Sequence, residues 1–302
     1  IESLQNHSDA AKEALDAIPP LLEKFRQSVL AAAFRGDLTK AWRAQNPDVE
    51  PATELLKRIR AERRARWIAD AAEKGRAKAE AKAVKAGKPW SDEDDTKVLE
   101  KERAKAAKKY KEPEPVDTEG LPELPEGWCW AWLSDCGEVS RGKSKHRPRN
   151  DARLFGSDYP FIQTGEVARS TGRISKASKF YSEFGLAQSR LFPVGTVCIT
   201  IAANIADSAV LDVAACFPDS VVGVIPDAGL LPSELIEFYI RTVRDDLDAV
   251  APATAQKNIN LAVLRQVAVP VPPEPEQKVL LLAISESLAS VEWLDNAEGT
   301  SS

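Results

Sequence analysis

Methionine is absent from the 302 residues of this chain, and histidine and cysteine are scarce. The two histidines, His7 and His146, are far apart, and no two of the four cysteines form a C-x-x-C pair. Zinc sites normally need paired ligands at short spacing, so we expect no metal site. Scattered thiols in a chain of this size are typical of a cytoplasmic protein, in which cysteine behaves as a small hydrophobic residue.

No hydrophobic run approaches the roughly 20 residues that a membrane-spanning helix needs, so we expect no membrane association. No signal peptide is visible, and the chain starts at Ile1 rather than at methionine, so we expect either a fragment of a longer protein or a natural half-subunit. The formal net charge is −5. An acidic chain does not coat nucleic acid through its overall charge, so any nucleic-acid-binding surface must be a local cluster of basic residues.

The motifs of common DNA-modifying and hydrolytic enzymes are also missing. Neither Glu234 nor Glu237 is followed by the lysine that a PD-(D/E)xK nuclease needs, and no Asn/Asp-Pro-Pro-aromatic loop of an amino-methyltransferase occurs. Two histidines leave little for a Ser-His-Asp triad. The stretch 137–144 matches a phosphate-binding loop formally, but no helical pattern follows it. We therefore predict no catalytic residues, with a nucleotide-binding enzyme as an alternative.

The chain divides into three segments of different composition. Residues 1–112 are rich in the helix formers Ala, Glu, Lys and Arg, and we assign them to a helical spacer region. Residues 113–275 start with a Pro-rich acidic linker and continue with short β-rich runs, which indicates a globular domain. Residues 276–302 return to a helical pattern.

In the first segment, apolar residues recur three and four positions apart over residues 11–32, which is the spacing of a coiled-coil seam. Pro19 and Pro20 interrupt the seam, so we expect a kink or a restart there. Gly36 is expected to end the helix.

A second helix is expected after Pro51, with apolar residues up to Trp67. Residues 74–111 have few apolar anchors among Ala, Lys and Glu, so we expect a solvated helix or a mobile insertion. The basic cluster at residues 57–66 suits a solvated helix face, DNA phosphates or a partner subunit, and the sequence leaves these alternatives open.

The rest of the chain predicts a mixed fold. We expect strands at residues 128–133, 194–202, 209–213, 221–225 and 266–271, and a helix over 233–247 with Leu235, Phe238, Tyr239 and Val243 on one face. A second helical seam comprises Leu281, Ile284, Leu288, Val291 and Leu294. Two seams at opposite ends of the chain predict an antiparallel pair of helices. The predicted fold class is therefore α+β, with a globular α/β domain attached to long antiparallel, coiled-coil-like helices.

The strongest local signal is the run R-G-K-S-K-H-R-P-R at residues 141–149. Basic residues alternate along it, no acid occurs before Asp151, and Gly142 and Pro148 predict a loop. Cations suit phosphates, and Arg, Gln and Asn side chains suit base edges; a solvated basic loop is the alternative. The predicted DNA-binding residues are Arg141, Lys143, Ser144, Lys145, His146, Arg147, Arg149, Gln163, Thr164, Arg169, Arg173, Lys176, Lys179, Asn204, Gln256, Lys257 and Asn258.

Three stretches together resemble the specificity subunits of type I restriction-modification systems. They are L-L-E-K-F-R-Q-S-V-L-A-A-A-F-R-G-D-L-T at 21–39, L-P-E-G-W-C-W-A-W-L-S at 124–134, and Q-K-N-I-N at 256–260 with V-P-V-P-P-E-P-E-Q at 269–277. They resemble the end of that family's central conserved helix, the start of a target recognition domain, and the exit from this domain into the next conserved helix.

The resemblance implies a non-catalytic subunit with one target recognition domain over 113–275. It implies double-stranded DNA and methyltransferase subunits as partners, a restriction subunit joined through the complex, and a second copy of the chain if it is a half-subunit. No cofactor is expected in this chain, because S-adenosylmethionine belongs to the methyltransferase and ATP and Mg to the restriction partner. A coiled-coil scaffold without DNA specificity is the alternative. The insertion at about 50–110 and the short final helix depart from the family pattern.

Overall fold

A computed structural model describes residues 17–202, 204–227, 229–250 and 258–299, with the backbone alone for residues 291–299. The chain divides into two compact units, residues 53–117 and residues 1–52 with 118–302. Within the described part of the chain, none of the helices combines the length and the hydrophobicity of a membrane span. The functional division at residues 112 and 275 stays a prediction.

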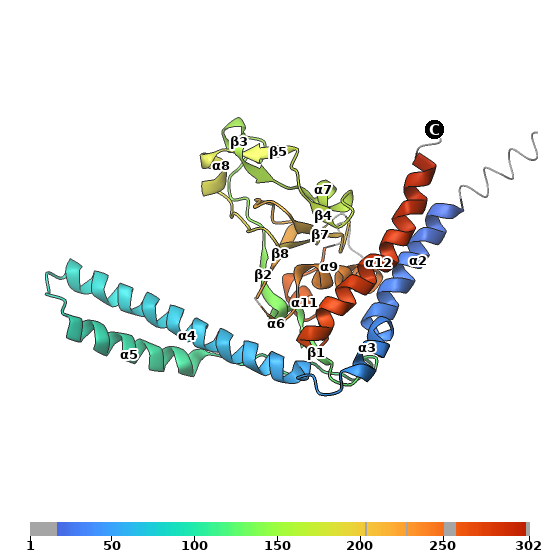
Figure 1. Ribbon diagram of the computed structural model, residues 1–302. Helices are drawn as coiled ribbons and strands as arrows, with labels where there is room; N and C mark the ends of the chain where they lie inside the picture. The colour runs from blue at the N-terminus through green and yellow to red at the C-terminus, as the bar shows by residue number, and fades with distance from the viewer. Residues whose placement is uncertain (1–16, 203, 228, 251–257, 300–302) are drawn as a thin grey trace, which may run out of the picture. The chain divides into compact units, whose positions relative to one another are not determined.

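Two long helices form the arms of the larger unit. α2 (Ile18–Phe34) and α12 (Glu274–Gly299) lie side by side and run in opposite directions (Figure 1), so the predicted antiparallel pair is confirmed. Pro19 and Pro20 lie in the first turn of α2, where the missing N–H of proline costs no hydrogen bond. The predicted kink or restart stays a prediction, because residues 1–16 lie outside the described part of the chain. Gly36, at a φ of 77°, follows the end of α2, as expected.

The buried faces of the arms differ in detail from the predicted seams. Leu22 and Val29 are buried, but Phe25 between them is 48% exposed, and Leu280, one position outside the predicted seam, is fully buried. Both arms also contact α9 (Ser233–Thr242), so two neighbours rather than one decide which side is buried. The seam positions in residues 1–16 and the side chains of 291–299 lie outside the described part of the chain.

The globular head is built on a five-stranded sheet with the order β2-β8-β6-β7-β4. Neighbouring strands are antiparallel, except for the parallel pair β4–β7. α9 and α7 (Thr164–Ala168) contact β6 and β7. The strands are β2 (Gly137–Arg141), β4 (Arg173–Ile174), β6 (Val197–Thr200), β7 (Ser208–Leu211) and β8 (Val221–Pro226).

The core of the head is hydrophobic and closely packed. Phe192 stacks on Phe217 with ring centroids 4.0 Å apart, and both side chains are fully buried. They lie against Gly223 of β8, where an added Cβ would approach both rings to 2.8 Å, so only glycine admits this packing. Cys198 is buried in this core and Cys216 in a second cluster with Phe161 and Tyr181, which agrees with their interpretation as small hydrophobic residues.

Two smaller ribbons extend the head. β3 (Phe155–Phe161) pairs with β5 (Lys179–Tyr181), and the ribbon packs with η2 (Ala152–Leu154) and α8 (Glu183–Ala187). β1 (Cys129–Trp132) pairs with β9 (Ala268–Val271), which joins the start of the head to its end. Short helices flank this second ribbon, α6 (Leu133–Cys136) and α11 (Leu261–Arg265).

All five predicted strands are confirmed, with ends that differ by up to three residues, but the helix predicted over 233–247 is wrong in length. It ends at Thr242, and α10 (Arg244–Ala249) follows after a break at Val243. Phe238 and Val243 are only half-buried, whereas Ile236 and Ile240 are fully buried. α9 packs against both the sheet and the arms, so its apolar face is wider than a single stripe.

Residues 53–117 form a helical hairpin. α4 (Ala52–Lys85) and α5 (Asp92–Lys109) are joined by a short turn, and Trp67 packs edge-on against Tyr110 with centroids 5.3 Å apart. Small residues at the interface, such as Ala72 and Ala106, are buried. Residues 74–111 are therefore largely helical, in agreement with the predicted solvated helix. After α2, the chain reaches α4 through η1 (Asp37–Thr39) and α3 (Lys40–Gln45).

Candidate DNA-binding surface

The strand directions bring several loops to one end of the five-stranded sheet. β2 and β6 end there and β8 begins there, since Arg141 is paired with Val222 and Thr200 with Val221. β7, which is antiparallel to β6, also begins there. The loops 142–150, 201–207 and 217–220 therefore meet at this end, which we call the loop end.

The backbone of the predicted basic loop is anchored on its neighbours. The N–H of Gly142 donates to the carbonyl of Val221 at 2.8 Å, and that of Lys143 donates to the carbonyl of Phe217 at 3.1 Å. Further along, the N–H of Lys145 donates to the carbonyl of Gln188 at 3.1 Å. Residues 142–150 form a loop, as predicted, and three backbone hydrogen bonds hold it in place.

The basic side chains of this loop fall into two groups. Arg149 forms an ion pair with Asp219 at 3.0 Å, and Arg147 donates to the carbonyls of Ser144 and His146 at 2.7 and 2.8 Å. Arg141, Lys143 and Lys145 form no ion pair within the described part of the chain. Arg141 and Lys145 are exposed and Lys143 is half-buried. These three cations are available to a ligand.

His146 anchors the loop. Its Nε2 lies 2.7 Å from the Asp151 carboxylate, and its ring packs edge-on against Phe184 with centroids 5.2 Å apart. Asp151 also accepts from the Arg153 guanidinium at 2.8 Å. The hydrogen bonds from Arg153, and then that from His146, hold the pKa of the Asp151 carboxyl well below its usual value. Burial raises the pKa of the Tyr181 hydroxyl, and the neighbouring Ser144, which is half-buried, partly offsets this effect.

Two predicted polar residues lie at the loop end, and two lie beyond the described residues. Asn204 is exposed, and its carbonyl accepts from the Thr200 hydroxyl. Asn258 is exposed and forms a bridge with Ala202, next to the same loop. Gln256 and Lys257 fall in residues 251–257, which the structure does not describe.

The residues predicted around α7 are partly placed at the same end. β4 runs parallel to β7, so residues 169–172, which precede β4, lie at the loop end, and Arg169 there is exposed. Gln163 precedes α7, and its N–H donates to Glu166 at 2.8 Å. Thr164 is the first residue of α7, and both Gln163 and Thr164 are half-buried.

The side chain of Arg173 points away from the loop end. It forms ion pairs with Asp212 and, at 3.0 Å, with Glu234 of α9. It also lines a cavity shared with Leu281 and Leu288 of α12, so its side chain is on the arm side of the head. Lys176 and Lys179 are exposed, and the Lys179 ammonium lies 5.9 Å from the Phe155 ring centroid on the β3–β5 ribbon.

The turn 217–220 is also part of this surface, although its residues were not among the predicted DNA contacts. Its Asp219 fixes Arg149, and the Ser220 carbonyl accepts from the N–H of Ile201 at 3.0 Å. The residues F-P-D-S are a turn signal that identifies the turn but not its place beside the basic loop.

The formal phosphate-loop match at 137–144 does not form such a loop. Its first five residues are strand β2, and no helix follows Ser144 before η2 at Ala152. A phosphate-binding loop needs the N-terminus of a helix directly after the glycine-rich turn. Among the described residues, no group of three or more His, Cys, Asp or Glu side chains is arranged to hold a metal ion.

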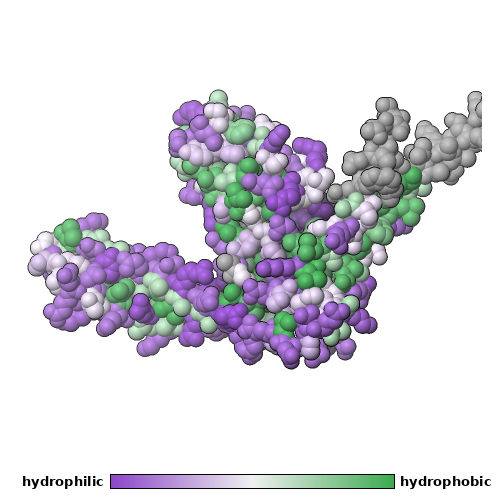
Figure 2. All heavy atoms as spheres, in the orientation of Figure 1, coloured by the Kyte–Doolittle hydropathy of each residue, from purple (hydrophilic) through white to green (hydrophobic). Residues whose placement is uncertain are grey.

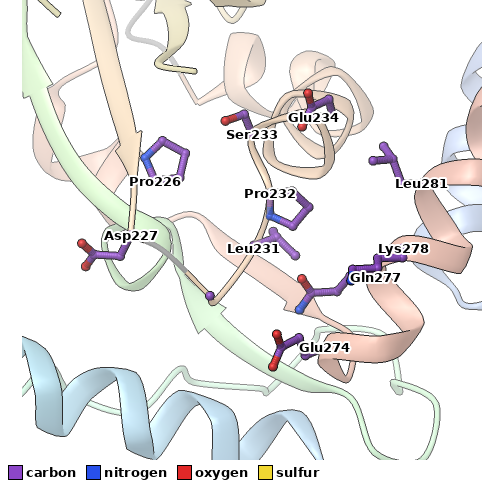
Figure 3. A pocket seen from close by; sticks show the side chains of 11 residues that line it. Pro226, Asp227, Leu231, Pro232, Ser233, Glu234, Glu274, Gln277, Lys278 and Leu281 are labelled. Carbon is purple, nitrogen blue, oxygen red and sulfur yellow. The ribbon is translucent and has the colours of Figure 1, made fainter. Parts of the chain in front are cut away.

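A groove of about 400 Å³ lies where the C-terminal arm leaves the head (Figure 3). Glu234 of α9 faces it from one side, and Lys278 and Leu281 of α12 from the other. Asp227 and Glu274 add two more carboxylates. Since acids outnumber its single lysine, this groove does not suit a phosphate.

Comparison with known proteins agrees with this architecture. Residues 125–288 match the family described as "Type I restriction modification DNA specificity domain". The EcoBI and EcoKI specificity subunits, both from Escherichia coli, are each 39% identical over 69 residues, which cover 22% of this chain and 15% of each relative.

Solved structures show similarity over a longer part of the chain. A structure concerning complex assembly and conformational transition of the type I R-M system aligns with 83% of this chain and 53% of that chain, at a TM-score of 0.50 and 20% identity. The HsdS subunit from Thermoanaerobacter tengcongensis aligns with 59% of this chain and 41% of that chain, at a TM-score of 0.47 and 18% identity. The chain thus spans about half the length of the first of these proteins and less of the second.

Proposed function

Because this chain belongs to the type I restriction modification DNA specificity domain family, we propose that it is the DNA-reading component of a type I restriction-modification complex. Its head reads one half of a split double-stranded target through the loop end. The chain contributes no catalytic residue. Base flipping and adenine methylation belong to bound methyltransferase subunits, which carry S-adenosylmethionine, and ATP and Mg act in a restriction subunit.

One observation carries this proposal: an acidic chain presents free cations on an anchored loop at one end of its sheet. Lys143 and Lys145 neutralise phosphates and set the register on the duplex. Arg141, Asn204 and Asn258 lie beside them with the side chains that read base edges. Each well-placed bidentate contact to a base discriminates by about 1–3 kcal/mol.

The arms supply the contact to other subunits. Leu21 and Phe25 of α2 and Leu282 of α12 are 63%, 48% and 63% exposed. Hydrophobic residues gather along these helices in Figure 2. Exposed apolar side chains on a long helix pair suit another helical chain, either a methyltransferase subunit or a second copy. At about 1.5 Å per residue, such helices fix the distance between two recognition heads.

Co-expression with a methyltransferase subunit, followed by co-purification and sequencing of methylated bases in the host DNA, tests the proposal. We expect a stable complex and one split motif that is methylated only when both chains are present. The double variant Lys143→Gln/Lys145→Gln should retain the complex and lose methylation. A complex that methylates no defined motif, or wild-type methylation by the double variant, contradicts the proposal.

A further inference from the structure

The hairpin of residues 53–117 has a charge opposite to that of the rest of the chain. It contains 19 Lys and Arg residues against 14 Asp and Glu residues, whereas the remainder contains 22 against 32. The surface of the hairpin in Figure 2 is mostly hydrophilic. This unit therefore concentrates positive charge in a protein that is acidic elsewhere.

Ion pairs within the hairpin neutralise many of its acids. Arg76 alone contacts three carboxylates, those of Glu73 at 2.7 Å, Glu80 at 3.1 Å and Asp95 at 2.5 Å. Two further acids, Glu93 and Glu102, pair with lysines at 2.6 and 3.2 Å. Of these contacts, the ion pair between Arg76 and Asp95 joins α4 to α5, and the others lie within one helix.

The unpaired lysines are regularly spaced along α4. Lys74, Lys78, Lys82 and Lys85 follow one another at steps of four, four and three residues, so they lie along one side of the helix. Successive members are about 4.5–6 Å apart along the helix axis. All four are exposed, and within the described part of the chain none of them forms an ion pair.

A groove between the two helices is lined by lysines from both sides. It has a volume of about 480 Å³, with Lys74 and Lys78 from α4 facing Lys105 and Lys109 from α5. Its carboxylate, Glu102, is already paired with Lys105. The other lining residues are Ala71, Gly75, Ala106 and Trp67. The groove is therefore cationic, unlike the acidic groove beside the C-terminal arm.

We propose that this lysine-lined face of the hairpin is a second DNA-binding surface, which holds duplex phosphates without reading sequence. The inference rests on the proposed function in one respect, because that function makes double-stranded DNA the polyanion that the protein meets. Lysine is a flexible point charge that suits phosphates, whereas protein interfaces are depleted in lysine and built around an apolar centre. The groove offers only Trp67, 41% exposed, as a large apolar side chain.

Salt-dependent binding of the full chain, in complex with its methyltransferase, tests this surface. The probes are a duplex that carries the methylated motif and a scrambled duplex of equal length. The test variant is Lys74→Gln/Lys78→Gln, and the matched control is Lys57→Gln/Lys97→Gln, which removes two hairpin lysines that lie outside the groove and are ion-paired. Circular dichroism verifies that both variants retain their helix content.

We expect the test variant to bind both duplexes roughly tenfold more weakly and the slope of log K against log salt to fall by about two, since each lost phosphate contact removes about one. The ratio between the two duplexes should not change, and the control should bind like wild type. Unchanged affinity and slope in the test variant overturn the inference. So does weaker methyltransferase binding with normal DNA binding, because the occupant is then an acidic protein.

The two proposals fail in different ways. If wild type does not distinguish the motif from the scrambled duplex, the proposed function of the head is wrong. The hairpin inference still stands if the lysine variant lowers the salt slope on both probes. If the motif is distinguished but the hairpin variant behaves like wild type, only the hairpin inference is wrong.

Discussion

The buried carboxylate of Glu276, in the first turn of the C-terminal arm, accepts a hydrogen bond from the indole of Trp128 at 2.9 Å. Trp128 lies at the start of the head, directly before β1. The same carboxylate accepts from the Thr39 hydroxyl at 2.6 Å and from the Arg43 guanidinium at 2.5 Å. The three stretches that resemble specificity subunits, far apart in sequence, therefore converge on one side chain.

Removing this carboxylate should destabilise the junction of arms and head. We expect Glu276→Ala to lower the free energy of unfolding by about 3 kcal/mol, because it leaves the partly buried Arg43 without its counter-charge and the Trp128 and Thr39 donors without an acceptor. Chemical denaturation of the full chain measures the loss.

Glu274, in the same helical turn but exposed, is the matched control. Glu274→Ala should change the free energy of unfolding by no more than about 0.5 kcal/mol. Equal effects of the two substitutions would show that Glu276 acts through helix propensity or surface charge rather than through its buried hydrogen bonds.

Two basic residues predicted from the sequence as DNA contacts should behave differently. Lys145 is exposed and forms no ion pair in the described part of the chain, so Lys145→Gln should lower the salt slope of DNA binding by about one. Arg173 is engaged by Asp212 and Glu234 on the arm side, so Arg173→Gln should leave the slope unchanged. Because Arg173 is surface-exposed, its loss should cost at most about 1 kcal/mol of stability. A reduced slope for Arg173→Gln would place it in the DNA interface after all.

The Asp151 anchor predicts a pH-dependent contribution to stability. Its pKa in the folded protein lies well below the ordinary 3.8, so the contribution is present above that value and is lost as the pH falls through the lower folded-state pKa. Asp151→Asn should therefore lower Tm at pH 7, and the difference from wild type should shrink below about pH 4. Melting curves between pH 7 and pH 3 measure this.

Asp158, an exposed carboxylate on β3, provides the control. Asp158→Asn should change Tm little at any pH. A difference for Asp151→Asn that stays constant down to pH 3 would mean that the substitution acts through packing rather than through the charge.

The sequence correctly predicted those elements whose own residues favour the conformation that they adopt. The end of α2 before Gly36 and the strands around Cys198 and Val222 follow from glycine geometry or from short apolar runs. The strands β2, β3, β4 and β5 were not predicted. In β3, polar residues and a register irregularity between Phe155 and Tyr159 hide the alternation.

The candidate site was predicted less completely, because the partners of its basic residues are distant in the sequence. The basic run indicated a ligand-facing loop, but the partners that occupy Arg149 and Arg173 come from 70 and 39 or more residues away. Which cations are free is therefore a property of tertiary packing. Spacing along the chain shows that a positive charge is present, but not whether a carboxylate neutralises it.

Gly142 should be the residue on which the shape of the basic loop depends most. It is buried, and a Cβ added there would overlap the carbonyl oxygens of both Phe217 and Pro218, which are backbone atoms that cannot rotate away. Gly142→Ala should therefore shift the loop off the turn 217–220, lower the free energy of unfolding by about 1–3 kcal/mol and weaken DNA binding. The comparison is Gly165→Ala, where the nearest atom is the end of the flexible Arg169 side chain. Gly165→Ala should retain wild-type stability in denaturation, and full DNA binding by Gly142→Ala would show that the loop does not need this close backbone approach.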